Sequence, residues 1–110
     1  MALPIRYERD SRGWRRAQAS PPYELVAAYL TVEVQASATN ARELLEAIDG
    51  VRAGASRWER TGNGYHLTLE NREAHIVTLW DDPPSYCVVG LDDFRNAVEG
   101  WRTFVDRQLA

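Results

Sequence analysis

The sequence DDFRNAVEGWRTFVDRQL, residues 92–109, decides the fold because it is typical of one long amphipathic helix. Its apolar residues recur at spacings of three and four, which places them on one continuous stripe. They are Phe94, Ala97, Val98, Trp101, Phe104, Val105 and Leu109. Asp92 and Asp93 stand in the first turn, where the helix dipole favours negative charge. Burial stabilises a fold by roughly 2 kcal/mol for each large apolar side chain, so this stripe must lie against another layer.

The residues upstream of this helix predict that layer, a meander of short strands. Residues 57–61 and 65–70 flank Gly62-Asn63-Gly64, a strong hairpin signal. Residues 74–80 and 86–89 are expected to follow as two more strands. Apolar and polar residues alternate along 65–70 and 74–80, so one face of the sheet is expected to be buried.

The first third of the chain predicts a hairpin and then a longer strand. Residues 5–9 and 14–19 flank a polar turn at 10–13. Residues 23–34 place apolar side chains at every second position, which is typical of a strand. The alternating residues are Val26, Ala28, Leu30, Val32 and Val34.

A short helix is expected between this strand and the meander. Ser37, Thr39 and Asn40 offer capping oxygens, and the helix is predicted to run to about Asp49, with Gly50 as its stop. Its apolar stripe is Leu44, Leu45, Ile48 and Val51. Residues 1–110 are therefore predicted to form a single α+β domain, in which an antiparallel meander is packed by a short central helix and a longer C-terminal amphipathic helix.

Composition limits the class of protein. A chain of 110 residues is the size of one domain, and 45% hydrophobic with 26% charged residues argues against disorder. No apolar run reaches the roughly 18 residues that span a bilayer, so we expect no membrane partner. The N-terminal residues lack a signal-peptide pattern, which predicts a cytoplasmic protein. Cys87 is the only cysteine, which excludes an internal disulfide.

Charge is distributed unevenly along the chain. Residues 1–20 hold five arginines against two acids, a local +3, and the other ninety hold eight arginines against fourteen acids, a local −6. An acidic body disfavours direct nucleic-acid binding and suits a basic protein partner. The stretch Trp14-Arg15-Arg16 has the chemistry to stack on an unpaired base, which leaves a nucleic-acid role as an alternative.

The side chains that catalysis requires are few. His66 and His75 fall on neighbouring predicted strands, and Glu70 or Glu73 could add a third zinc ligand, but exposed strand positions are the preferred interpretation. Cys87 lies in an apolar strand and is expected to pack in the core rather than react. We therefore expect no enzyme activity, no cofactor and no metal.

A protein-binding surface is the favoured interpretation of the remaining polar features. Asp81 and Asp82, stiffened by Pro83 and Pro84, predict a rigid acidic loop that would lose little entropy on meeting a basic surface. A solvated turn is the alternative. The predicted partner-binding residues are Glu70, Glu73, Trp80, Asp81, Asp82 and Tyr86.

Two groups of residues resemble a known family. Trp58, Arg60, Gly62, Tyr65 and Leu67 reproduce the motif W-x-R-x-G-x-x-Y-x-L of the small bacterial YacL-like (UPF0231) family. The start and stripe of the last helix resemble that family's terminal helix, and several N-terminal residues, Glu33 among them, fall at similar spacing. The chain departs from the pattern at Trp101, where tyrosine is usual, and in a shorter loop before Tyr86.

The resemblance implies no catalytic residues, because the family has no established activity, and it supports a housekeeping protein of unknown regulatory or binding role. Small acidic α+β proteins also resemble the immunity proteins of bacterial toxin systems, including contact-dependent growth inhibition (the CdiI type). On that analogy the leading hypothesis is an immunity protein that occludes the active site of a cognate toxin, a basic nuclease domain.

Overall fold

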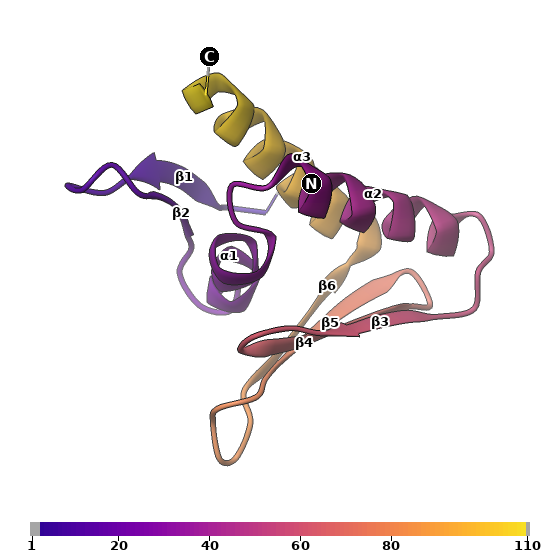
Figure 1. Ribbon diagram of the computed structural model, residues 1–110. Coiled ribbons are helices and arrows are strands. Elements are labelled where there is room, and N and C mark those ends of the chain that lie inside the picture. Colours follow the sequence, from indigo (N-terminus) through magenta and orange to yellow (C-terminus); the bar gives the residue numbers. More distant parts are fainter. Residues whose placement is uncertain (1–2, 110) are drawn as a thin grey trace.

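A four-stranded antiparallel sheet lies at the base of the fold, and the helices pack on one side of it (Figure 1). The computed structural model describes the backbone of residues 3–109 and the side chains of residues 3–107. The strands follow sequence order and are β3 (Trp58–Thr61), β4 (Tyr65–Glu70), β5 (Glu73–Thr78) and β6 (Tyr86–Gly90). The predicted α+β architecture and the meander are confirmed, although the third strand ends before Trp80.

The two faces of this sheet differ sharply in burial. Leu67 pairs with Ile76, and Ile76 pairs with Cys87, so these three side chains share the inner face that the helices cover. The residues that alternate with them along each strand, His66 and Val88 among them, point to the outer face. Every described helix lies on the inner side, which leaves the outer face open (Figure 1).

The C-terminal helix α3 (Leu91–Leu109) forms as its periodicity predicts. Phe94, Val98 and Trp101 are almost fully buried, because the stripe lies against the sheet and the neighbouring helices. The Trp101 indole Nε1 also donates a hydrogen bond to the backbone oxygen of Gln35 at 2.7 Å. The side chain of Leu109, the last residue of the predicted stripe, lies outside the described side chains.

The central helix α2 (Ala38–Arg52) begins as predicted but ends later than expected. Ser37 is the N-cap, and its hydroxyl accepts a hydrogen bond from the Asn40 amide at 3.1 Å. Gly50 lies inside the helix and does not stop it, because Val51 continues the buried stripe by one further turn. Gly54, at φ +121°, follows the helix end in a conformation that favours glycine.

The strand predicted over residues 23–34 is wrong. This segment forms α1 (Glu24–Tyr29) and continues into η1 (Leu30–Val34), a wider helical turn in which the Gln35 amide bonds back to Leu30 at 2.9 Å. Apolar residues at every second position also include residues that are four apart, and residues four apart lie on one face of a helix. Of the alternating apolar residues in this segment, the buried ones are four apart. Val26, Leu30 and Val34 are buried, whereas Val32 is exposed.

The N-terminal hairpin forms a separate two-stranded sheet from β1 (Arg6–Arg9) and β2 (Arg15–Gln18). Tyr7 attaches it to α3, since its hydroxyl donates to the backbone oxygen of Ala97 at 2.9 Å. The Tyr7 ring stacks on Phe104 with centroids 6.0 Å apart. A Cβ at Gly100 would lie 2.7 Å from the Tyr7 hydroxyl, so this close approach of hairpin and helix requires glycine.

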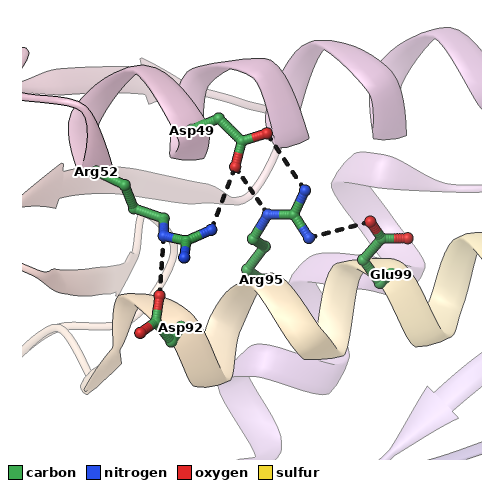
Figure 2. Close-up of polar contacts among 5 residues, drawn as sticks. All are labelled: Asp49, Arg52, Asp92, Arg95 and Glu99. Atoms are coloured by element: carbon green, nitrogen blue, oxygen red, sulfur yellow. Dashed lines mark hydrogen bonds and ion pairs between the residues drawn. The ribbon is translucent and has the colours of Figure 1, made fainter.

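A network of charged side chains joins α2 to α3 (Figure 2). Arg95 of α3 holds Asp49 of α2 through two bonds, of 2.8 and 3.2 Å, and contacts Glu99 at 3.1 Å. Arg52 of α2 reaches Asp92 of α3 at 3.0 Å. The hydrogen bond from Arg95 holds the pKa of the Asp49 carboxyl below its usual range.

This network gives the first testable prediction. The pKa of Asp49 is lower in the folded state than in the unfolded state, where it is about 3.9. The ionised carboxylate therefore stabilises the fold at pH values above the unfolded pKa, and this stabilisation is lost as the pH falls through the folded-state pKa. Wild type should therefore exceed Asp49→Asn in stability at pH 7, by at most about 1 kcal/mol because exposed ion pairs are screened. The difference should shrink below about pH 4 in urea titrations. Glu46→Gln, an exposed change on the same helix, is the control. A difference that persists unchanged into acid would contradict this account.

Candidate interaction surface

Exposed apolar side chains gather around the β5–β6 connection. Trp80 and Tyr86 are 65% and 72% exposed, and Leu79 and Val88 are 49% and 39% exposed. Tyr86 pairs with Val77 across the two strands, and Val88 follows two residues later on the same outer face. We call Leu79, Trp80, Tyr86 and Val88 the aromatic edge.

The strands and the neighbouring turn fix these positions. β5 ends at Thr78, and the Leu79 amide donates to the backbone oxygen of Gly64 at 2.9 Å, which ties the chain to the β3–β4 turn. Trp80 then lies over Gly64, where an added Cβ would be 3.5 Å from the indole ring. The sequence predicted Trp80 and Tyr86 as anchors, but it did not single out Leu79 or Val88. The sequence signal for these two residues was an apolar side chain at a position of the predicted strands that alternation assigns to the outer face of the sheet.

The predicted acidic loop, residues 81–85, follows directly. Asp81 is half-buried, and its carboxylate accepts hydrogen bonds from Ser85 at 3.0 Å and from Thr78 at 3.3 Å. Asp82 is exposed. The two acids therefore differ in role, because Asp81 closes the loop while Asp82 is presented to solvent beside the aromatic edge.

Glu70 and Glu73 lie at the other end of the sheet. They pair with each other across the β4–β5 turn, and five residues of strand, about 17 Å, separate Glu73 from Thr78. Glu70 contacts Arg57 at 3.7 Å, and Glu73 contacts His75 at 3.3 Å. The predicted partner-binding residues are thus divided between two ends of the sheet, because their register could not be read from the sequence.

The two histidines lie on the outer face but are engaged locally. Thr61 shares a 2.8 Å hydrogen bond with Nδ1 of His66, and Glu59 lies 3.5 Å from its Nε2. His75 is opposite Thr68, two pairs further along the strands than His66. Within residues 3–107, no group of three or more histidine, cysteine, aspartate or glutamate side chains is placed to hold a metal ion.

Cys87 packs in the core, as predicted. It is 7% exposed, and its Sγ lies 3.2 Å from the backbone oxygen of Pro22. Burial, followed by the nearby Glu24 carboxylate, raises the pKa of the Cys87 thiol. A raised pKa disfavours the thiolate, which is the reactive form.

The tip of the β1–β2 hairpin lies away from the β5–β6 connection (Figure 1), and it carries another exposed aromatic residue. Trp14 is 69% exposed at the hairpin tip. The Asp10 carboxylate orders this tip by accepting hydrogen bonds from the amides of Arg12 and Trp14 at 2.9 and 3.0 Å. Trp14 is therefore a matched comparison for Trp80, with similar exposure and different surroundings.

The β3–β4 turn next to the aromatic edge is held by Glu33 of η1. Its carboxylate accepts hydrogen bonds from three successive amides, those of Asn63, Gly64 and Tyr65, at 2.9, 2.8 and 3.1 Å. A Cβ at Gly62 would collide with this carboxylate. Gly62 and Tyr65 of the sequence motif thus both lie against the carboxylate of Glu33, a residue about thirty positions earlier in the sequence.

Fold and surface together define a two-layer α+β domain with an open, aromatic sheet edge. The model of the Uncharacterised protein family (UPF0231) matches residues 5–81, and the chain belongs to this family. The resemblance predicted from the motifs is confirmed.

Curated relatives agree with this assignment. A UPF0231 protein of Yersinia pestis (strain Pestoides F) is 27% identical over 88% of this chain and 93% of its own length. A UPF0231 protein of Proteus mirabilis is 25% identical over 90% of this chain and 92% of its own length. No solved structure is a significant match. The matching family and these relatives carry no toxin or immunity description, so they lend no support to the contact-dependent growth inhibition analogy.

None of the helices described between residues 3 and 109 is long and apolar enough to cross a membrane.

Proposed function

We propose that this protein is a cytoplasmic, non-catalytic binding protein that holds another protein through the aromatic edge. The observation that carries the proposal is the clustering of exposed apolar side chains. Among the described residues, six large hydrophobic side chains are exposed, and four of them form the aromatic edge. Single exposed apolar residues are ordinary, whereas a contiguous patch marks an interaction surface.

The chemistry of the aromatic edge supports a protein partner. Tryptophan and tyrosine are enriched among the few residues that dominate binding energy, because each buries a large ring and can still satisfy its polar atom. Asp82 is exposed in the loop that connects Trp80 to Tyr86. Charge at the rim of an interface governs partner choice and association rate more than affinity. Membership in the uncharacterised UPF0231 family fits a family member of unknown role better than a toxin-specific immunity protein.

The test is quantitative affinity capture from the native bacterial host, with the wild-type domain and two variants immobilised in equal amounts. Trp80→Ser with Tyr86→Ser removes both anchors from exposed positions, so the fold should persist. Loss of an anchor costs about 2 kcal/mol, so the captured partner should fall by at least about thirtyfold. Trp14→Ser is the control and should capture as wild type does. Equal capture by the wild type and the double variant would contradict the proposal.

A narrower form of the proposal makes the partner a basic nuclease toxin that the domain neutralises. Its support is the acidic body of the chain and the exposed Asp82 at the rim. Under this form, Asp82→Arg should weaken partner affinity in calorimetry by about tenfold or more, and Asp81 is kept because its carboxylate closes the loop. Glu70→Arg with Glu73→Arg, at the distant end of the sheet, should leave it unchanged. Unchanged affinity in the first variant would remove the basic-toxin hypothesis and leave the housekeeping role.

A further inference from the structure

We infer that the partner contributes an extended, basic segment that adds to β6 as a further strand of the sheet. This inference rests on the proposed function and specifies how the aromatic edge binds. Its first support is the position of β6, which is the last strand of the sheet and pairs only with β5 among the described strands.

The register shows which backbone groups of β6 point away from β5. Hydrogen bonds from Thr78 N to Ser85 O at 2.9 Å and from Leu91 N to Arg72 O at 2.8 Å mark the two ends of the β5–β6 ladder. Bonded pairs alternate in an antiparallel ladder, so Cys87 and Val89 bond to β5. The amide and carbonyl groups of Tyr86 and Val88 and the amide of Gly90 therefore point outward, and all three residues are exposed.

The two edges of the sheet differ in how they are protected. The opposite edge strand, β3, carries Glu59 and Arg60, and both are engaged in ion pairs, with Arg57 at 3.0 Å and with Glu43 at 3.4 Å. Charged edge strands of this kind discourage pairing with another chain. The β6 sequence, YCVVG, has no charge and no proline. An edge without these features is suited to accept a strand.

Charge indicates the chemistry of the added segment. Asp82 is exposed in the loop that enters β6. Glu24 is also exposed, and it stands two residues after Pro22, whose backbone oxygen lies 3.2 Å from the Sγ of Cys87. The β6 edge therefore has a carboxylate on the loop before it and another beside its inner face. An added strand with apolar side chains against Tyr86 and Val88 and with basic residues near these acids would complement both features.

The same charges disfavour a second copy of this chain as the occupant. Antiparallel pairing of two β6 strands about Val88 would bring the acidic loop of each copy, residues 81–85, towards Asp92 and Asp93 of the other. Like charges facing each other across strands are destabilising. A separate basic segment avoids this repulsion.

The test uses a displayed library of random nine-residue peptides, selected on the intact domain. Enriched peptides should alternate apolar residues and carry arginine or lysine. A peptide chosen from them is then synthesised with N-methyl groups on either of its two alternating sets of amides. One set should weaken binding by about tenfold or more in fluorescence anisotropy, because it faces β6, and the other set should have little effect.

The matched protein variant is Val88→Pro, which removes an outward amide that β5 does not use. Proline is tolerated at such edge positions, so the sheet should persist. Peptide binding should fall by about tenfold or more. Equal sensitivity of both N-methylated sets, enrichment of peptides without alternation, or no enrichment at all would overturn the inference. So would a concentration-dependent dimer that Val88→Pro dissociates.

The inference and the proposed function fail separately. If the native partner is lost with Trp80→Ser and Tyr86→Ser but kept with Val88→Pro, the aromatic edge binds by side-chain contacts alone and strand addition is wrong. If neither change affects the native partner, the proposed function itself is wrong.

Discussion

Trp101→Ala is expected to destabilise the domain by about 4 kcal/mol, the largest effect of any change considered for the core. Trp101 is 1% exposed, and its ring contacts Tyr7 and Phe104, with centroids 6.2 and 5.9 Å away. Truncation would leave a cavity at the point where the hairpin, η1 and α3 meet. Domains of this size are stable by about 5–15 kcal/mol, so this loss is a large fraction of the total.

The measurement is urea unfolding followed by circular dichroism, with Trp101→Phe as the matched variant. Phenylalanine keeps most of the buried ring but cannot donate to the backbone oxygen of Gln35, so its cost should be about 1–2 kcal/mol. If alanine and phenylalanine cost the same, the hydrogen bond rather than the packing would dominate, contrary to this account. A cost below about 1 kcal/mol for alanine would mean that Trp101 is not a core residue.

Glu33→Ala is expected to cost about 3 kcal/mol, because it removes an acceptor from three backbone amides at once. Hydrogen bonds to a charged group are stronger than neutral ones, and all three lie between 2.8 and 3.1 Å. The Glu33 side chain is only partly buried, so water would replace some of the lost bonds and limit the cost. Glu43→Ala, which breaks an exposed ion pair with Arg60, should cost less than about 1 kcal/mol.

A double-mutant cycle tests the origin of this cost. Gly62→Ala should destabilise the wild type, because its Cβ would displace the Glu33 carboxylate. Once Glu33 is alanine, the same change should be nearly neutral. The two costs should therefore be strongly non-additive, as for groups in direct contact. Additive costs would mean that Gly62 is required for a reason unrelated to Glu33.

The parts of the fold that follow from local periodicity could be predicted from the sequence. The α3 stripe recurs at helical spacing from Phe94 to Val105, and the Gly62-Asn63-Gly64 turn is a strong local hairpin signal, so both were predicted correctly. Residues 23–34 were misread because Val26, Leu30 and Val34 satisfy both periods. Only the packing of α1 beside the β1–β2 hairpin and the sheet separates the two possibilities, and that packing is not local.

The candidate surface could be predicted only in part. Trp80 and Tyr86 were found by residue type and by their place around an acidic loop. Glu70 and Glu73 belong to the opposite end of the sheet, a consequence of strand register rather than of sequence distance. The Glu33 contact with the β3–β4 turn joins segments about thirty residues apart, and no spacing rule predicts it.

Amide hydrogen exchange, compared between the free domain and its complex with the captured partner, tests the central claim most directly. If the aromatic edge binds the partner by strand addition, exchange at Tyr86, Val88 and Gly90 should slow in the complex, while the hairpin tip at residues 10–14 stays unchanged. Protection confined to that tip or to α2, with β6 exchanging at its free rate, would contradict the account.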